Sequence, residues 1–263
     1  MKLSVAIPTY NSSKYLLDCL SSLKKIDHVD EIVINDDCSS EDEYSKILKI
    51  KEDFSKGKRI NILLNRNDKN LGGFKNKYIT ISKCKNKFVY QIDSDNIAGL
   101  NTNKILDINF KTLDSEIFYL PSKVYVFKKN PLVSSFRKKY KVLLTNSNKV
   151  LTKKMVLEAM KSDQSLFIDV NNKWVFNLGN FIVDKKMFLQ RMKLPFESND
   201  LPIAADPLAM CYFWLKNGGK IGLIKNFYHF HRLRSDGYWH TAGNDAKISV
   251  EFFESKLKEL NND

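Results

Sequence analysis

The sequence lacks any apolar run near the roughly 20 residues that a helix needs to cross a bilayer. Its opening residues, MKLSVAIPTYN, become polar too soon for a secretory signal. Its cysteines are scattered, without a C-x-x-C pair or a disulfide-like spacing: Cys19, Cys38, Cys84 and Cys211. These absences argue against a disulfide scaffold and a membrane-spanning protein, and they predict a cytoplasmic protein with reduced thiols.

Internal repeats and linker-like segments are also absent. The chain has 263 residues, of which 43% are hydrophobic and 12% aromatic, so its composition is that of an ordinary globular protein. This length is enough to bury one good core. We therefore expect a single domain over residues 1–263.

Acidic residues are missing from one long stretch. Residues 117–157 contain ten basic residues and no acid, so they supply most of the net charge of +13. A basic block suits nucleic acid, an anionic membrane surface or an acidic substrate, and it is also typical of a solvated face in a Lys-rich chain. No recognised nucleic-acid module accompanies it, so we expect no nucleic-acid partner.

Strands and helices alternate in the first 100 residues. Short aromatic and β-branched runs predict strands over 3–7, 31–34, 60–64 and 88–92. Apolar residues recur at helical spacing after the first three strands, and Ser40 with Glu43 offers a capping box for the second helix. Such repeated β-α units predict a parallel sheet with right-handed crossovers, flanked by helices.

The remaining residues are less regular. Strands are predicted on either side of Pro121, over 116–120 and 123–127, and also over 176–183 and 220–224. Helices are predicted over 153–160, 207–217 and 245–260. The last helix is amphipathic, so it either docks onto the body or forms an oligomer contact. We expect a smaller mixed region beside the parallel sheet.

Two carboxylates, Asp93 and Asp95, end the fourth predicted strand in the segment KFVYQIDSDN. Residues i and i+2 of a strand point the same way, so both acids can face one ligand. Two close carboxylates repel each other unless a cation lies between them. Oxygen ligands suit Mg²⁺ or Mn²⁺ with positions left open for phosphates. The pattern predicts a metal-diphosphate site, although D-x-D alone is short and also occurs by chance.

Four segments follow the predicted strands in order: PTYN at 8–11, DDCS at 36–39, NLGG at 70–73 and DSD at 93–95. This order resembles the family-2 glycosyltransferases, whose pattern is P-T/S-Y-N, D-D-x-S, N-x-G and D-x-D. The resemblance is strong over 1–100 and loose over 175–240. It implies a GT-A fold, the Rossmann-like fold of nucleotide-diphospho-sugar transferases. It also implies a nucleotide-sugar-binding half at 1–100, an acceptor-binding and catalytic half at 101–244, and a C-terminal helix at 245–263.

The resemblance implies a nucleotide site at the carboxyl ends of the strands. Tyr10 would stack on the base, and Asp37 or Asp36 would accept the uracil imide proton, with a turn role as the alternative for Asp36. The family usually has A-R-N where this chain has Asn76-Lys77-Tyr78, so Lys77 contacts phosphate or lies on a solvated helix face. The expected nucleotide-binding residues are Pro8, Thr9, Tyr10, Asn11, Asp36, Asp37, Gly72, Lys75, Lys77, Asp93 and Ser94.

The resemblance also implies a catalytic base at a helix start, in a pattern similar to E/D-D-x-x-L. Asp206 matches this position directly before Pro207, and it would take the proton of the acceptor hydroxyl. Its alternative role is that of a helix N-cap. Pro207 replaces the usual second acid, which leaves Asp200 and Glu197 as fallback candidates.

The metal would be bound by Asp95 and Asp93. Some relatives add a histidine, for which His231 is favoured over His229. The alternative is that His229 is a core histidine and that the nearby arginines are solvated. Arg232 or Arg234 would meet the diphosphate under a lid at 235–243. Acceptor contacts are expected at Trp174, Gly179 and Asn180, with a core position as the alternative for Trp174.

The sequence therefore predicts a cytoplasmic, Mn²⁺- or Mg²⁺-dependent, inverting glycosyltransferase. It would move a hexose or N-acetylhexosamine from a UDP-sugar to a glycan or lipid-linked glycan acceptor, in the synthesis of a bacterial surface polysaccharide (capsule, lipopolysaccharide or O-antigen). The basic block would give peripheral contact with an anionic membrane. One alternative, a sugar-nucleotide pyrophosphorylase, requires a Gly-rich loop that PTYNSS lacks. The other is a nucleic-acid-binding protein, which rests on the net charge.

Overall fold

The computed structural model describes residues 2–56, 60–127, 140–143, 148–161, 179–197, 206–234, 236 and 244–260. The first four strands lie parallel in the spatial order β3-β2-β1-β4. Their bounds are β1 (Leu3–Thr9), β2 (Val29–Asp36), β3 (Asn61–Arg66) and β4 (Phe88–Gln91). The predicted parallel sheet is thus confirmed for the first part of the chain.

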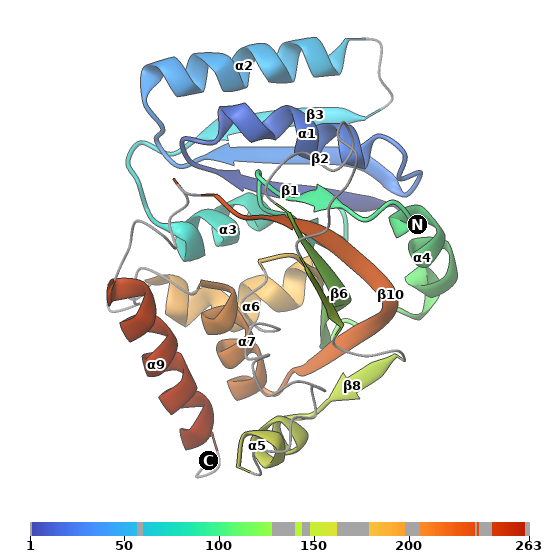
Figure 1. The fold of residues 1–263 in the computed structure, drawn as a ribbon, viewed down its shortest axis with the longest axis vertical. Helices are drawn as coiled ribbons and strands as arrows, with labels where there is room; N and C mark the ends of the chain where they lie inside the picture. Colours follow the sequence, from blue (N-terminus) through green and yellow to red (C-terminus); the bar gives the residue numbers. More distant parts are fainter. Residues whose placement is uncertain are drawn as a thin grey trace.

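The second part extends the same sheet with strands of mixed direction, so that the full order is β3-β2-β1-β4-β9-β6-β10-β5. Figure 1 shows the long strands β6 and β10 of this part below the parallel strands β1, β2 and β3. The strand β9 lies antiparallel to β4 and β6, whereas β6 and β10 are parallel. Two short strands are attached at the side, β7 on β6 and β8 on β10. The bounds are β5 (Ile97–Ala98), β6 (Ile117–Phe127), β7 (Tyr140–Leu143), β8 (Lys149–Leu151), β9 (Phe181–Asp184) and β10 (Lys220–Arg232).

Helices cover both faces of the sheet, and each face has its own apolar core. One face is covered by α1 (Ser13–Leu23), α2 (Glu41–Ser55), α4 (Thr102–Asn109) and the 3-10 turn η1 (Phe110–Thr112). The other is covered by α3 (Gly73–Ser82), α6 (Lys185–Glu197), α7 (Asp206–Lys216) and α9 (Asn244–Glu259), and α5 (Lys153–Lys161) contacts α9 and β8.

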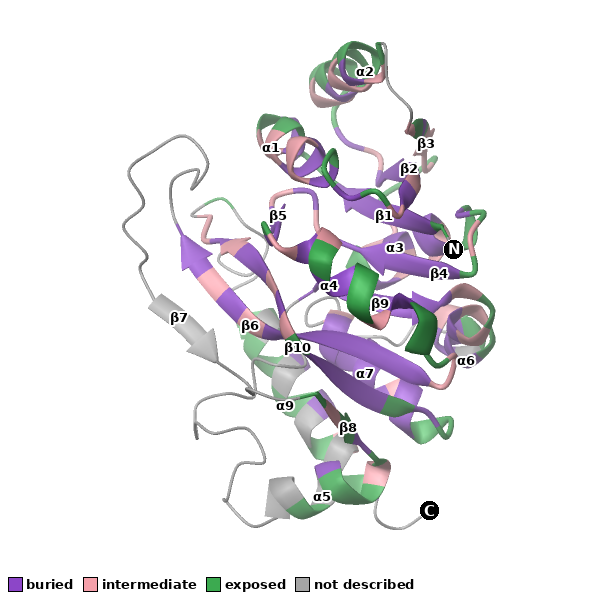
Figure 2. Ribbon diagram, turned by 90° about the vertical axis from the view of Figure 1, so that its right-hand side faces the viewer, coloured by how far each residue is buried: buried purple, intermediate pink, exposed green. Residues whose placement is uncertain are grey.

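Every residue of β1 is buried, as expected for a parallel strand with helices on both faces. Leu3, Val5 and Ile7 belong to the core under α1 and α2, whereas Ala6 belongs to the core under α3. This alternation follows the two-residue period of a strand. Figure 2 shows the central strands as almost continuously buried.

The predicted cap of α2 is present in part. Ser40 Oγ accepts a hydrogen bond from the Glu43 backbone N–H (3.4 Å). The Glu43 carboxylate accepts from the backbone N–H of Ser13, the first residue of α1 (3.0 Å). Glu43 thereby joins the N-termini of two helices that both begin at the carboxyl edge of the sheet.

The two strands predicted around Pro121 form one strand, β6, and the separate assignment was wrong. Pro121 pairs with Ile224 in β10, and the β10 register shifts immediately afterwards, between Ile224 and Tyr228. Because proline has no N–H to donate, an irregularity in the neighbouring strand accommodates it. The strand β10 continues through this bulge to Arg232, beyond its predicted end at 224. The strand predicted over 176–183 begins at Phe181 in β9, and 176–178 lie outside the described residues.

Candidate active site

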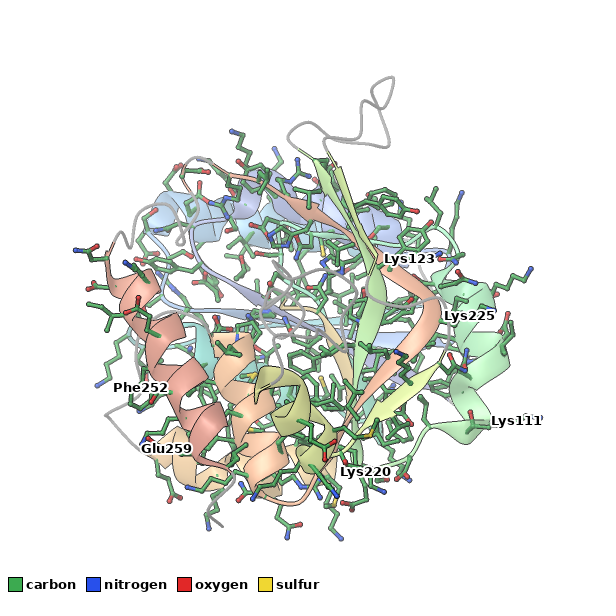
Figure 3. All side chains as sticks on the ribbon, turned by 60° about the horizontal axis from the view of Figure 1, so that its bottom comes forward. Lys111, Lys123, Lys220, Lys225, Phe252 and Glu259 are labelled. Carbon is green, nitrogen blue, oxygen red and sulfur yellow. The ribbon has the colours of Figure 1, made fainter. Side chains whose placement is uncertain are left out.

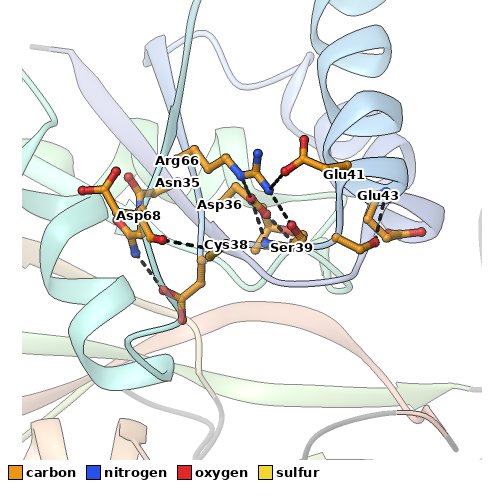
Figure 4. Close-up of polar contacts among 12 residues, drawn as sticks. Asn35, Asp36, Cys38, Ser39, Glu41, Glu43, Arg66 and Asp68 are labelled. Carbon is orange, nitrogen blue, oxygen red and sulfur yellow. Dashed lines mark hydrogen bonds and ion pairs between the residues drawn. The ribbon is translucent and has the colours of Figure 1, made fainter.

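Asp36, the first acid of the DDCS segment, is held mainly by its own loop. Asp36 accepts hydrogen bonds from both the backbone N–H (3.0 Å) and the hydroxyl of Ser39, and Arg66 Nε lies 3.4 Å from its carboxylate (Figure 4). The Asn11 backbone N–H donates to Ser39 Oγ (2.8 Å), and Asn11 Oδ1 accepts from the Ser40 N–H (3.2 Å). Asn11 has a positive φ of 45°, which asparagine tolerates well. These contacts join the PTYN and DDCS segments, and they favour the turn role of Asp36.

Asp37 holds the loop before α3. Its Oδ1 accepts from Asn67 Nδ2 (2.7 Å) and the Leu71 N–H (3.0 Å), and its Oδ2 accepts from the Gly72 N–H (2.9 Å). Gly72 has a φ of 83°, which explains the need for glycine there. Burial raises the pKa of Asp37, and these donors oppose the rise. A carboxylate has about four lone-pair sites, so Asp37 keeps capacity for a ligand donor.

Tyr10 presents an aromatic ring beside this cluster, with 47% of the residue exposed. Thr9 is buried, and its carbonyl accepts from the Asp37 N–H (2.9 Å) and from Asn76 Nδ2 (3.4 Å). Pro8 is a member of β1 and pairs with Asn35 in β2. Pro8 and Thr9 of the PTYN segment are therefore buried supports, whereas the exposed ring of Tyr10 is available for stacking.

Asp93 lies in a closely packed loop after β4. Its Oδ1 accepts from Gln91 Nε2 (3.0 Å), and its backbone N–H donates to Asn180 Oδ1 (3.0 Å). Gly179 has a φ of 72°, and a Cβ placed on it would overlap Asp93 Oδ2. Gly179 and Asn180, predicted as acceptor contacts, thus lie directly against the D-x-D loop. Ser94 in this loop is buried.

Lys77 joins Asp93 to Asp206. Its Nζ lies 3.0 Å from Asp93 Oδ1 and also donates to Asp206 Oδ2. Burial disfavours the charged form of Lys77, but the Asp206 and Asp93 carboxylates outweigh it and raise the pKa of this ammonium above its ordinary value. Burial raises the pKa of Asp93 to about 6, although Lys77 opposes the rise. Lys77 is therefore buried in an ion-paired network and does not lie on a solvated helix face.

Asp95 is paired with the end of β10. Its Oδ2 lies 3.3 Å from Arg234 Nη1, which also donates to Ser12 Oγ (2.8 Å). The Arg234 guanidinium lies 4.7 Å from the centre of the Tyr15 ring, and its Nε donates to Asp236 (3.1 Å). Arg234 therefore connects the D-x-D loop with the start of α1.

Arg232 is more deeply fixed than Arg234. Its Nη2 donates to Asp18 (2.8 Å), its Nε donates to the Asp95 carbonyl (3.0 Å), and it is buried. The rings of Tyr15 and Phe127 each lie 4.7 Å from its guanidinium carbon. Arg232 lies within β10 and supports the backbone of Asp95, so Arg234 is the better placed of the two arginines to meet a diphosphate.

His229 and His231 lie on one face of β10, as alternation predicts, with ring centres 6.0 Å apart. His229 is buried, and neither ring nitrogen has a hydrogen-bond partner among the described residues. Burial lowers the pKa of both imidazoles, and Asp95 opposes this for His231. His231 Nδ1 likewise lacks a partner in the described part of the chain. The lowered pKa of each imidazole favours its neutral form, which is the form that can ligate a metal.

Several predicted residues lie away from this network or outside the described residues. Lys75 Nζ lies 5.9 Å from the centre of the Phe196 ring in α6. Glu197 is the exposed last residue of α6. Trp174, Asp200 and nearly all of the predicted lid at 235–243 lie outside the described residues.

Sequence reasoning missed the polar face of α1. Ser12, Tyr15 and Asp18 contact Arg232 or Arg234, although none of the three was predicted for the site. A signal was available, because these residues follow PTYN directly and recur every three positions. That spacing places side chains on one face of a helix.

Comparisons with known proteins agree with this geometry. Residues 4–99 match the family model for glycosyl transferase family 2. The poly(ribitol-phosphate) beta-N-acetylglucosaminyltransferase TarS of Staphylococcus aureus is 34% identical over 108 residues, which are 40% of this chain and 18% of TarS. An uncharacterized protein of Methanocaldococcus jannaschii is 38% identical over 93 residues, 34% of this chain and 38% of that protein. The similar segments thus span well under half of either relative.

Solved structures extend the likeness to the whole fold. S. aureus TarS 1–349 in complex with UDP-GlcNAc resembles this chain with a TM-score of 0.61 at 19% identity, over 97% of this chain and 65% of that one. A further S. aureus TarS structure gives a TM-score of 0.60 at 18% identity, over 100% of this chain and 43% of that one. Residues 4–99 of the chain thus match glycosyl transferase family 2, as their four segments indicated, and the chain has the GT-A fold.

Proposed function

We propose that the protein is an inverting glycosyltransferase that uses a UDP-sugar as donor. The observation that carries this proposal is the link between the D-x-D loop and the candidate base, because Asp93 and Asp206 both contact Lys77 Nζ. The exposed ring of Tyr10 lies at the same carboxyl edge, beyond the end of β1. Ligands of open α/β sheets bind at this edge.

The donor we favour is a UDP-N-acetylhexosamine, with a UDP-hexose as the broader class. This choice is supported by the relatives, since one is named as a beta-N-acetylglucosaminyltransferase and was solved with UDP-GlcNAc and with UDP. Tyr10 would stack on the uracil, and the remaining lone pair on Asp37 Oδ2 would accept its imide proton. Arg234 would leave Asp95 to meet the diphosphate.

The reaction would proceed in one displacement. An acceptor hydroxyl attacks the anomeric carbon as Asp206 takes its proton, a new C–O bond forms, and the bond to UDP breaks with its electron pair leaving on the diphosphate. The opposite sides of attack and departure invert the sugar's configuration. Asp206 opens α7 directly before Pro207, so its backbone direction is set by a helix start. The acceptor we favour is a glycan or lipid-linked glycan of a bacterial surface polysaccharide.

A divalent cation, Mn²⁺ or Mg²⁺, fits the donor types present. Asp93 and Asp95 offer carboxylate oxygens, and His231 offers a neutral ring. Among the described residues, no group of three or more His, Cys, Asp or Glu is arranged to hold a metal alone. Donor phosphates and water would then complete the coordination, as is usual for Mg²⁺. Bound there, the cation would offset the charge that develops on UDP.

We also propose that the enzyme works in the cytoplasm at an anionic membrane surface. Within the described residues, no helix has the length and apolar character to cross a bilayer. Figure 3 shows Lys123 of the basic block toward one side of the molecule, together with Lys111 and Lys225. Residues 128–139 and 144–147 of the block lie outside the described residues. Sedimentation with vesicles tests this contact. Equal binding to vesicles with and without anionic lipid would contradict it.

The decisive experiment is calorimetric titration of UDP, GDP, CDP and TDP, each with Mn²⁺ and with EDTA. We expect metal-dependent binding of UDP that is lost in Asp95→Ala. Asp53→Ala removes an exposed carboxylate from α2 and serves as the matched control, with unchanged affinity. Binding of none of the four nucleotides would rule out the proposed donor site.

A further inference from the structure

Asp206 sits against one face of α3, which provides both space and charge for it. Gly73 and Lys77 are four residues apart, so they lie on the same face of this helix. A Cβ on Gly73 would come within 3.0 Å of Asp206 Oδ1, so glycine leaves room for the carboxylate. One turn later, the Lys77 ammonium donates to Asp206 Oδ2.

The other end of this arrangement is fixed by Asp93. Lys77 Nζ also contacts Asp93 Oδ1, which accepts from Gln91 Nε2 as well. The Asp93 backbone is bound to Asn180, and Gly179 packs against its carboxylate. Lys77 therefore connects α7 to the Asp93 loop, which Gln91, Asn180 and Gly179 also hold in place.

We propose that Gly73 and Lys77 form the seat of the catalytic base, with Lys77 as a positioning residue that holds Asp206 at a fixed place relative to the D-x-D loop. This inference rests on the proposed function, in which Asp206 takes the acceptor proton. It replaces the phosphate role expected for Lys77 from the sequence. A base displaced by about 1 Å can lose about 100-fold in rate, so such a seat has a large expected effect.

The partners of Lys77 argue against a phosphate role. The Lys77 ammonium has three N–H donors, and it already contacts the carboxylates of Asp93 and Asp206. The Lys77 side chain is only 7% exposed. A phosphate would have to compete with both carboxylates inside the protein. Arg234 is paired with Asp95, which would bind the cation instead. Arg234 can therefore turn to the diphosphate at a lower free-energy cost than Lys77.

Kinetics of UDP release from the UDP-sugar, together with UDP affinity by calorimetry, distinguish the two roles. We expect Lys77→Met to lower kcat about 100-fold while UDP affinity changes by less than about 3-fold, because a misplaced base affects the transition state and leaves nucleotide binding intact. Lys77→Arg should recover most of kcat, and Gly73→Ala should lower kcat in the same way. Lys83→Met, at the exposed C-terminal end of α3, is the matched control and should match the wild type.

The opposite result would contradict the positioning role. If Lys77→Met leaves kcat unchanged and weakens UDP affinity about 10-fold, Lys77 contacts the phosphates. If Asp206→Asn keeps wild-type turnover, the proposed function fails instead, which is a separate result. If the wild type turns over no UDP-sugar, the contact between Lys77 and Asp206 can still be tested from melting temperatures. The variants compared are Lys77→Met, Asp206→Asn and the double variant. We expect the melting temperature of the double variant to fall by less than the sum of the decreases in the two single variants. Additive losses would mean that Lys77 does not hold Asp206.

Discussion

The carboxylates at the sheet edge are held in two different ways. Asp36 and Asp37 receive most of their hydrogen bonds from backbone N–H groups and short side chains of neighbouring loops. Asp93, Asp95 and Asp206 are paired with the long basic side chains of Lys77 and Arg234. The first pair is therefore part of the scaffold. The second group is held by ion pairs: the one between Asp95 and Arg234 can be replaced by a substrate, whereas Lys77 stays between Asp93 and Asp206.

The difference follows from what each partner can do. A backbone N–H in a folded loop has no other position to take, so its acceptor stays fixed. The Arg234 side chain can turn toward a new anion such as a diphosphate, because a bound cation would take its place beside Asp95. The site thus combines a rigid nucleobase-binding side with a reaction side in which the Asp95–Arg234 ion pair is exchangeable and Lys77 stays fixed.

The largest effect should come from Gly179, which packs the reaction side. Gly179→Ala adds strain at a φ of 72° and a Cβ that overlaps Asp93 Oδ2, so we expect a loss of about 3 kcal/mol or more in unfolding free energy. Gly218→Ala is the matched control, because its φ is 82° but nothing lies within 4 Å of the added Cβ, and it should cost about 1 kcal/mol. Urea unfolding measures both. Equal losses would show that the Asp93 loop moves aside freely.

Asp36→Ala and Asp95→Ala should have opposite signatures. Removing Asp36 leaves the Ser39 donors and Arg66 without their buried acceptor, so we expect about 2 to 4 kcal/mol lower stability. Removing Asp95 frees a partly exposed Arg234 and should cost less than about 1 kcal/mol, while metal-dependent UDP binding is lost. Urea unfolding and calorimetry on both variants test the contrast. A large stability loss in Asp95→Ala would erase the distinction between the two regions.

The rigid side could be predicted from the sequence because its contacts lie within segments that directly follow strands. PTYN and DDCS lie where a strand ends, NLGG ends where α3 starts, and the parallel order of the strands brings them together. The strands of this part were also predicted to within a few residues. Local patterns were sufficient there.

The reaction side could not be predicted in the same way. Lys77 and Asp206 are separated by 129 residues, and Arg234 and Asp95 by 139, so no local pattern shows that they are paired. Pro121 suggested a break between two strands because the compensating irregularity lies in β10. Gly179 and Asn180 were identified as functional, but their support of Asp93 depends on β9 pairing with β4. Tertiary contacts determined each of these features.

Substitutions of Tyr10 test the nucleobase-binding side, and their expected effect is smaller. Stacking on an aromatic ring contributes about 1 to 3 kcal/mol per base, so Tyr10→Ala should weaken UDP binding about 5- to 150-fold. Tyr10→Phe keeps the ring and should bind UDP as the wild type does. Stability should change little, because Tyr10 is largely exposed. Equal binding of UDP by all three proteins would place the base elsewhere.

The smallest effect should be a pH dependence that separates Asp93 from Asp37. Because the folded-state pKa of Asp93 is about 6 and the usual value is 3.8, the folded protein takes up a proton between pH 6 and 4 that the unfolded chain does not yet bind. The contribution of Asp93 to stability should therefore fall as the pH rises through this window.

Urea unfolding in EDTA from pH 4 to 7 measures this contribution as wild type minus Asp93→Asn. We expect the difference to decrease by about 1 to 3 kcal/mol between pH 4 and 6 and to stay level above. The pKa of Asp37 is raised in the same direction, but three N–H donors oppose the rise, so Asp37→Asn should show the same sign with a shallower slope. A difference that increases with pH for Asp93 would mean that its ion pair with Lys77 outweighs its burial, and the reaction side would then be as firmly held as the scaffold.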